Sequence, residues 1–161
     1  MTPIRFTIIG EPASKANSRE IVKRGDRVAS IKSKKALSFE EDALKQIPPR
    51  FRVQLTGPVR VTLRIFYASE RPDLDESIVL DVMQDRYARE KLTKAQKDAG
   101  VTAQRYLVQR GVYVNDRQVR EKHVYHGIDR ANPRTEIHVE PLQAQQGGLA
   151  LELRVDDPLE V

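Results

Sequence analysis

The segment 59–67 alternates apolar and polar side chains over nine residues, and this pattern constrains the fold more than any other part of the chain. The apolar positions are Val59, Val61, Leu63, Ile65 and Tyr67, and the polar positions between them include Arg60, Thr62 and Arg64. Successive side chains of a β-strand point to opposite faces, so the pattern predicts a strand with one buried face. A sheet built on this strand needs other elements to cover that face.

Shorter patterns predict the elements around this strand. A β-branched run predicts a first strand over 4–9, and two more strands are expected over 119–126 and 135–142. Helical spacing of apolar residues predicts a helix over 34–47, with Ser38 and Glu41 as a capping box. We therefore expect an α+β single domain with a small mixed β-sheet and helices packed on one face.

A second helix is expected after the strand 59–67. Its apolar stripe consists of Ile78, Val79, Val82 and Met83. Beyond the stripe, the charges of residues 85–90 are spaced four apart as Asp85/Arg89 and Arg86/Glu90, which favours continuation of the helix through residue 97. The resulting charged helical extension would protrude from the domain and end near Gly100.

The 161 residues suit one domain, which we expect to cover 1–142. Residues 143–161 are expected to form a flexible connector followed by an acidic C-terminal tail or an edge strand. The sequence contains no Cys, which excludes disulfides, thiolate zinc sites and a Cys nucleophile, and is compatible with a reducing cytoplasm. No apolar run approaches the roughly 20 residues of a membrane span, and the first residues lack a signal-peptide core.

The positive charge of the chain is concentrated near its beginning. The pI is about 9.6, and residues 12–35 contain eight Lys or Arg against two acids. Small polar residues interleaved with the cations favour a surface that binds phosphate oxygens, although a solvated loop is the alternative. A hairpin across Gly25 and Asp26 is possible within this segment. The candidate DNA-binding residues are Lys15, Asn17, Arg19, Lys32, Lys34, Lys35 and Arg71.

Two aspartates one residue apart, Asp73 and Asp75, follow the strand 59–67. Alternate side chains of an extended segment point the same way, so the two carboxylates can converge on one cation. Mg²⁺ prefers hard oxygen ligands and uses few protein carboxylates. Asp116, after an apolar approach, is the best candidate for a third carboxylate, and Asp81 and Asp85 are its rivals. Asp81 is expected to face away from Asp75 on the helix. The alternative interpretation is that Asp73 or Asp75 only caps that helix.

Taken in order, these motifs resemble the RusA endodeoxyribonucleases, which are phage and prophage Holliday junction resolvases. The resemblance rests on Asp73-Leu74-Asp75 between a strand and a helix, and on the stretch Gly111-Val112-Tyr113-Val114-Asn115-Asp116-Arg117-Gln118-Val119. The segments Pro12-Ala13-Ser14-Lys15-Ala16-Asn17 and Asn132-Pro133-Arg134 are also similar to family motifs.

The resemblance implies a function and a site. It makes Asp73, Asp75 and Asp116 the catalytic carboxylates, with Mg²⁺ as the cofactor and Mn²⁺ as a possible substitute. It implies a homodimer with no membrane association that resolves four-way DNA junctions in recombination and repair. It also implies a phage- or prophage-encoded protein in the cytoplasm of a bacterial host.

The chain departs from the family pattern at three places. Glu76 stands where the family commonly has Asn, and Val79 stands where it has Lys. Lys91, Lys94 and Lys122 are candidates to replace that lysine. The interval between Asp75 and Asp116 is about twice that of the family's best-known member, which makes 86–108 an insertion that could enlarge the DNA grip or the dimer interface.

Other functions remain open at this point. A resolvase-derived protein that binds junctions or DNA without cutting is the main alternative, and Val79 favours it. A structural protein that docks a partner through the charged segment is another. The chain has no Asp/Glu-x-Lys of the restriction-nuclease type, and its His123 and His126 do not form a zinc motif.

Overall fold

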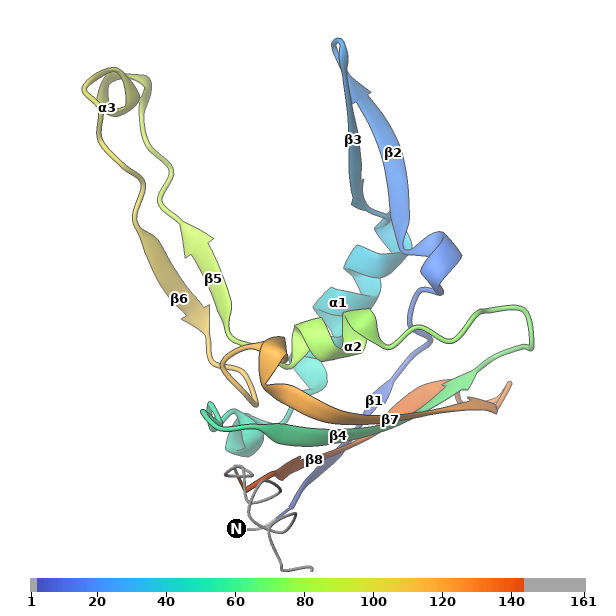
Figure 1. Cartoon of the computed structure of the whole chain (residues 1–161). Helices are drawn as coiled ribbons and strands as arrows, with labels where there is room; N and C mark the ends of the chain where they lie inside the picture. The colour runs from blue at the N-terminus through green and yellow to red at the C-terminus, as the bar shows by residue number, and fades with distance from the viewer. Residues whose placement is uncertain (1–2, 144–161) are drawn as a thin grey trace, which may run out of the picture.

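A four-stranded mixed sheet forms the base of the molecule in the computed structural model, which describes residues 3–143 (Figure 1). Its strands are β1 (Ile4–Ile9), β4 (Val59–Tyr67), β7 (Val119–Ile128) and β8 (Arg134–Pro141), in the order β1-β8-β4-β7. β8 is antiparallel to both β1 and β4, whereas β4 and β7 run parallel. Although β7 and β8 are consecutive, β4 lies between them.

Two helices, α1 (Lys34–Gln46) and α2 (Ser77–Val82), cover one face of this sheet (Figure 1). The alternation predicted for β4 is confirmed, because its apolar positions are fully buried and its polar positions are not. Ile78, Val79, Val82 and Met83 of the predicted stripe are also buried. The hydrophobic core therefore lies between the helices and the inner face of the sheet.

Two hairpin arms rise from the helix layer, away from the sheet, and diverge toward their tips (Figure 1). The first arm pairs β2 (Arg19–Arg24) with β3 (Arg27–Lys32) and follows the short 3-10 helix η1 (Lys15–Asn17). The second pairs β5 (Arg86–Arg89) with β6 (Arg105–Gln109) and carries α3 (Lys94–Asp98) at its tip. Two further 3-10 helices, η2 (Pro49–Phe51) and η3 (Asp116–Gln118), precede β4 and β7.

Several predicted features are confirmed. The domain is α+β with a mixed sheet, and its two larger helices lie on one face. The hairpin across Gly25 and Asp26 forms, with Gly25 in the left-handed region at φ 62°. The helix predicted over 34–47 is α1.

The predicted cap of α1 is wrong. Ser33, not Ser38, accepts the hydrogen bond from the Ala36 amide, and its hydroxyl also donates to the Asn17 carbonyl at 2.6 Å. The same side chain thus begins the helix and ties it to the base of the first arm. The extended backbone of Ser33 places it before the first turn, which the capping-box pattern at Ser38 did not reveal.

The predicted helical extension over 85–97 is also wrong, because α2 ends at Val82 and the extension is the β5–β6 arm. Backbone groups that would continue the helix bond to a distant segment instead. The carbonyl of Met83 accepts from the Val112 amide at 2.7 Å, and the Asp85 amide donates to the Val114 carbonyl. These long-range bonds outweigh the local charge spacing that favoured a helix.

Two remaining expectations concern the ends of the chain and membranes. The connector and tail predicted for 143–161 fall almost entirely outside the described residues. Among residues 3–143, no helix has the length and apolar character needed to cross a membrane.

Candidate functional site

The segment that contains Asp73 and Asp75 is anchored to the end of β4. The hydroxyl of Tyr67, the last residue of β4, donates to the Asp73 carbonyl and accepts from the Asp75 amide, both at 3.2 Å. Tyr67 is fully buried, and burial raises its pKa, so the hydroxyl stays protonated and can make both bonds. The strand thereby fixes the backbone of the aspartate motif.

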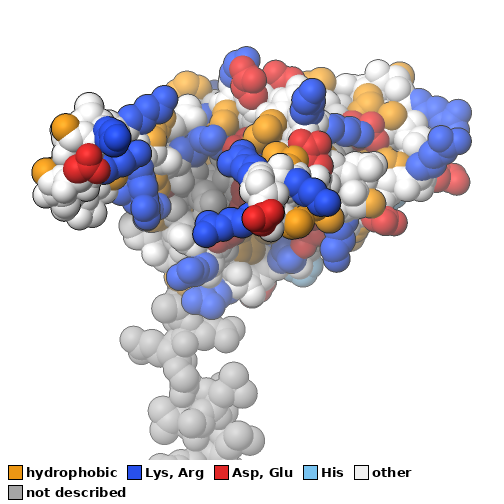
Figure 2. Space-filling model, turned by 90° about the horizontal axis from the view of Figure 1, so that it is seen from above, with side chains coloured by type: hydrophobic (Ala, Val, Ile, Leu, Met, Phe, Trp, Pro, Cys, Tyr) orange, Lys and Arg blue, Asp and Glu red, His pale blue; other side chains and the backbone are white. Residues whose placement is uncertain are grey.

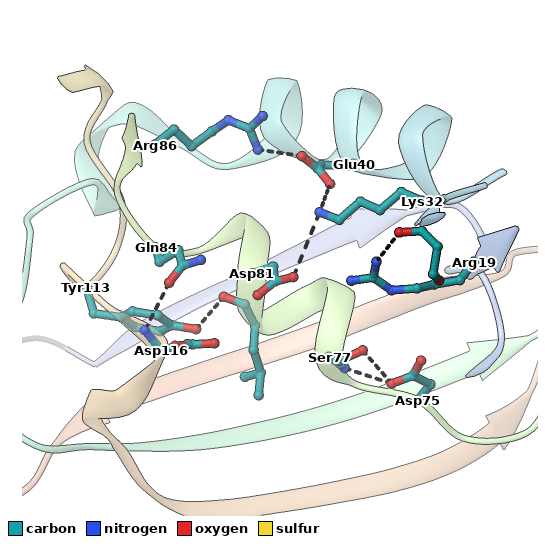
Figure 3. A network of polar contacts seen from close by, with 12 residues as sticks. Arg19, Lys32, Glu40, Asp75, Ser77, Asp81, Gln84, Arg86, Tyr113 and Asp116 are labelled. Carbon is teal, nitrogen blue, oxygen red and sulfur yellow. Dashed lines mark hydrogen bonds and ion pairs between the residues drawn. The ribbon is translucent and has the colours of Figure 1, made fainter. Parts of the chain in front are cut away.

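The two aspartates of the motif differ in their surroundings. Asp75 is buried, and its carboxylate accepts from the amide and the hydroxyl of Ser77 at 3.0 and 2.7 Å (Figure 3). It therefore satisfies the amide of the first residue of α2, although the N-cap position is Glu76 and not Asp75. Asp73 is exposed.

Asp116 lies at the opposite end of α2 from Asp75 (Figure 3). Its amide donates to the side-chain oxygen of Gln84 at 3.2 Å, and it begins η3 after the buried pair Val112 and Tyr113. The apolar approach predicted for Asp116 is therefore present. It places the carboxylate beside the C-terminal end of α2.

The charge of Asp116 acts on Asp81, which lies near the C-terminal end of α2. Burial raises the pKa of Asp81, and the negative charges of Asp116 and Glu40 add to this rise while Lys32 opposes it. Sequence reasoning treated Asp81 only as a rival ligand facing away from the motif. The structure instead makes it the neighbour of Asp116 at one end of α2.

The predicted triad is not gathered around one point. Within residues 3–143, no group of three or more His, Cys, Asp or Glu side chains is arranged to hold one metal ion. Asp73 and Asp75 lie before the first turn of α2, and Asp116 lies beyond its last turn. The structure therefore brings Asp116 together with Asp81 and not with the motif.

A charged network stands between the two arms. The carboxylate of Glu40 on α1 accepts from Lys32 at 2.6 Å and from Arg86 at 2.7 Å (Figure 3). Lys32 also lies 3.9 Å from the carboxylate of Asp81. Burial alone would raise the pKa of Glu40, but the hydrogen bonds and charges of Lys32 and Arg86 outweigh burial and lower it. Glu40 thus fixes one cation from each arm.

This network belongs to a cleft of about 390 Å³ at the base of the arms. The residues that line it come from both arms, α1 and the end of α2: Lys32, Glu40, Asp81, Gln84, Asp85, Arg86, Tyr87, Ala88, Arg89 and Arg105. Viewed from above, Lys and Arg side chains gather on both arms around this hollow (Figure 2). The cleft therefore combines carboxylates on its floor with cations on its walls.

The predicted DNA-binding residues are spread over the first arm and its surroundings. Lys32 lines the cleft, and Arg19 with Lys32, Ser77 and Asp81 lines a smaller neighbouring hollow. The other five are exposed around the base of that arm or in the lead-in to α2: Lys15, Asn17, Lys34, Lys35 and Arg71.

The second wall of the cleft was missed by sequence reasoning. Tyr87, Arg89 and Arg105 line it from the β5–β6 arm. The signal that could have found them is the short strand pattern Arg105–Gln109, which the charge spacing of 85–90 obscured.

The residues at which the sequence departs from the RusA pattern, Glu76 and Val79, can be located in the structure. Glu76 pairs with Lys122 of β7 at 2.5 Å, and this hydrogen bond lowers the pKa of Glu76 although burial opposes it. Lys122 is therefore engaged beside the motif, whereas Lys91 and Lys94 lie in the outer part of the second arm. Val79 is buried in the core.

Comparison with known proteins adds no assignment, since no protein-family model matches the chain and no curated protein matches it.

Proposed function

We propose that this protein is a Mg²⁺-dependent endonuclease that cuts branched DNA, with the four-way junction as its substrate. The observation that carries the proposal is the cleft between two cationic arms, which holds the carboxylate of Asp81 within 3.9 Å of the Lys32 ammonium and near Asp116. Such a cleft suits a ligand that is itself an anion and brings a divalent cation with it.

The charge of the arms supports a polyanionic substrate. Residues 12–35 contain eight Lys or Arg against two acids, and residues 86–110 contain seven against two. Two cationic walls raise the local concentration of a phosphate backbone and orient it by contacts that carry no sequence information. Recognition by DNA shape follows from such contacts.

The carboxylates fit Mg²⁺ in number and type. Mg²⁺ is typically held by one or two carboxylates, with waters and substrate phosphate in its other positions. Asp116 and Asp81 supply two carboxylates at one end of α2, and the resemblance adds Asp73 and Asp75 at the other. When bound, the metal would supply an activated water and neutralise charge at the phosphate.

Three other residues of the cleft, Glu40, Lys32 and Arg86, would position the substrate. Lys32 and Arg86 both donate to the Glu40 carboxylate. These bonds hold the two cationic side chains in defined positions instead of leaving them free to rotate. In the proposed enzyme they orient the phosphate beside Asp81 and Asp116. A homodimer, as the resemblance implies, would place two such clefts on opposing strands of a junction.

The test is cleavage of a synthetic four-way junction in Mg²⁺, with EDTA as the blank. Asp116→Asn is expected to keep the fold and junction binding and to lose cleavage by a factor of about 100 or more, since a carboxylate ligand is removed without a change of shape. Gel analysis of labelled strands measures the cut, and band shifts measure binding. Full cleavage by Asp116→Asn would remove this residue from the mechanism.

Two further variants separate the possible ligand sets. Asp75→Asn retains an oxygen that can accept from Ser77, so the start of α2 is preserved. Loss of cleavage in Asp75→Asn supports the triad that the resemblance implies. Retained cleavage there, with loss in Asp81→Asn, assigns the second ligand to the C-terminal end of α2.

A second candidate function is junction or DNA binding without cleavage. It is favoured by the lack of a three-ligand metal group among residues 3–143 and by Val79 in place of the family lysine. It predicts the same salt-dependent binding but no cut product in Mg²⁺ or Mn²⁺.

A further inference from the structure

The two faces of the β5–β6 arm carry different side chains. Opposite residues of an antiparallel pair share a face, so the pairs Tyr87–Leu107 and Arg89–Arg105 lie on one face of the arm. The next pair, Ala88 and Tyr106, lies on the other. Three of the four residues of the first face, Tyr87, Arg89 and Arg105, line the cleft, whereas only Ala88 of the second face does and Tyr106 does not. We therefore take the first face as the inner one.

An aromatic ring on this inner face is combined with cations. Tyr87 is 42% exposed although it lines the cleft, and the guanidinium of Arg105 lies 3.8 Å from the centre of its ring. The Tyr87 hydroxyl lies 3.5 Å from the Asp85 carboxylate, which places the ring at the base of the arm. Asp85 is in turn held by the Gly111 amide at 2.7 Å and by Gln54 at 2.8 Å.

A partly exposed ring, with the Arg105 guanidinium against one of its faces and Arg89 on the same face of the arm, has the chemistry that binds an unpaired nucleotide. The ring offers a π-surface on which a base can stack, and the neighbouring guanidinium groups can bind the phosphates on either side. Double-stranded DNA offers only phosphates to such a face, because its bases are stacked on each other. The inner face of the arm therefore matches a nucleotide that is unpaired or unstacked.

We propose that the inner face of the β5–β6 arm is a stacking platform for an unpaired DNA base, with Tyr87 stacking on the base and Arg89 and Arg105 binding its flanking phosphates. The proposal rests on the proposed function, because it takes DNA as the substrate, and it narrows the substrate to DNA with exposed bases, such as a branch point or a single strand. The outer face, with Tyr106, has no part in this contact.

The experiment compares Tyr87→Leu with Tyr106→Leu in the full chain, by fluorescence anisotropy at one salt concentration. The probes are a labelled single strand, a duplex of the same length and a four-way junction. Tyr87→Leu is expected to weaken single-strand and junction binding by about 5- to 150-fold, the range for loss of one stacked base, and to leave duplex affinity unchanged. Tyr106→Leu is expected to change none of the three affinities, and Tyr87→Phe is expected to bind like the unaltered chain.

A second measurement reports stacking directly. 2-Aminopurine placed next to the branch point is expected to be quenched by the unaltered chain and by Tyr87→Phe, but not by Tyr87→Leu. Circular dichroism melting of each variant establishes that it is folded.

The outcomes separate this proposal from the proposed function. Equal losses on duplex and junction, or no loss with Tyr87→Leu, would overturn the stacking platform whether or not the protein cuts DNA. Losses with Tyr106→Leu that follow protein concentration would make the arm a self-association surface instead. Tyr87-dependent binding without a cut product in Mg²⁺ would leave the platform standing and remove the nuclease.

Discussion

At the level of single residues, Gly111 is the position where the packing leaves least room. A Cβ there would lie 2.4 Å from the Met83 carbonyl oxygen and from the Gln84 carbonyl carbon, and 2.6 Å from the Asp85 amide nitrogen. All three atoms belong to the backbone, so no side chain can turn aside to relieve the contact. The chain at position 111 can therefore pass this close to residues 83–85, at the end of α2, only with glycine there.

Gly111→Ala is expected to lower the free energy of unfolding by at least about 1–3 kcal/mol, the usual cost of overpacking. Urea unfolding followed by circular dichroism measures the change. Gly57→Ala is the matched control, since no atom lies within 4 Å of a Cβ at Gly57. Equal stability of the two variants would contradict the close approach.

Glu40 gives a stability effect that depends on pH. Its pKa is lowered from the ordinary 4.5, since the bonds from Lys32 and Arg86 outweigh burial. A lowered folded-state pKa stabilises the protein fully above the unfolded-state pKa, and this contribution is lost as pH falls through the folded value. The pairing is therefore complete at neutral pH.

Glu40→Gln is expected to cost about 1–3 kcal/mol at pH 7, and the difference from the unaltered chain should shrink below about pH 4.5. Urea titrations at several pH values measure it. Glu41→Gln serves as the control, because Glu41 pairs with Lys45 at 3.2 Å where both side chains are largely exposed. A cost that is constant with pH would mean that the carboxylate charge of Glu40 does not act as described.

At the level of elements, the β5–β6 arm is the part of the fold that the sequence pattern concealed. Charges four apart favoured a helix, whereas the arm is held by long-range hydrogen bonds at its base. The Met83 carbonyl accepts from the amides of Val112 and Tyr113, and the Asp85 amide donates to the Val114 carbonyl. Such long-range bonds leave no mark in a local window of sequence. The first arm was easier to predict because Gly25 marks its turn.

Shortening the second arm tests its role as an element. The Glu90 amide donates to the Gln104 carbonyl at 2.9 Å, so an Asn-Gly turn can join these two residues and replace 91–103. None of the removed side chains is buried, and we expect the unfolding midpoint in urea to stay unchanged. The slope of log affinity for DNA against log salt should fall by up to about 0.9 for each of the lysines Lys91, Lys94 and Lys97 that contacts a phosphate.

A shortened arm with an unchanged salt slope would place its tip away from the DNA. A shortened arm that unfolds the domain would contradict the expectation that residues 91–103 add nothing to stability. Replacement of Lys23 and Arg24 by Gln on the first arm provides a comparison, since both are exposed near the tip of that arm.

At the level of the whole molecule, sequence patterns predicted the base better than the site. The alternation of 59–67 and the helical stripe after it are local, and both describe the observed sheet and helix correctly. The neighbourhood of Asp81 and Asp116 depends on how far α2 extends and where the chain returns after the arm. The spacing of residues in the sequence indicates neither the end of α2 nor the place where the chain returns. The proximity of Asp81 and Asp116 is therefore visible only in the three-dimensional structure.

The pairing of β1 with β8 has a consequence for how the chain is made. Ile4 lies opposite Val139, so β1 leaves the ribosome long before β8 and gains its partner only after the residues between them have been synthesised. Until then the backbone groups along one edge of β1 stay open to water or to other chains. Contacts so remote in sequence also slow refolding, to milliseconds or longer for typical domains rich in such pairings. An unpaired strand is a template for pairing with other chains, so this topology leaves β1 open to such pairing for longer than the other described strands during synthesis.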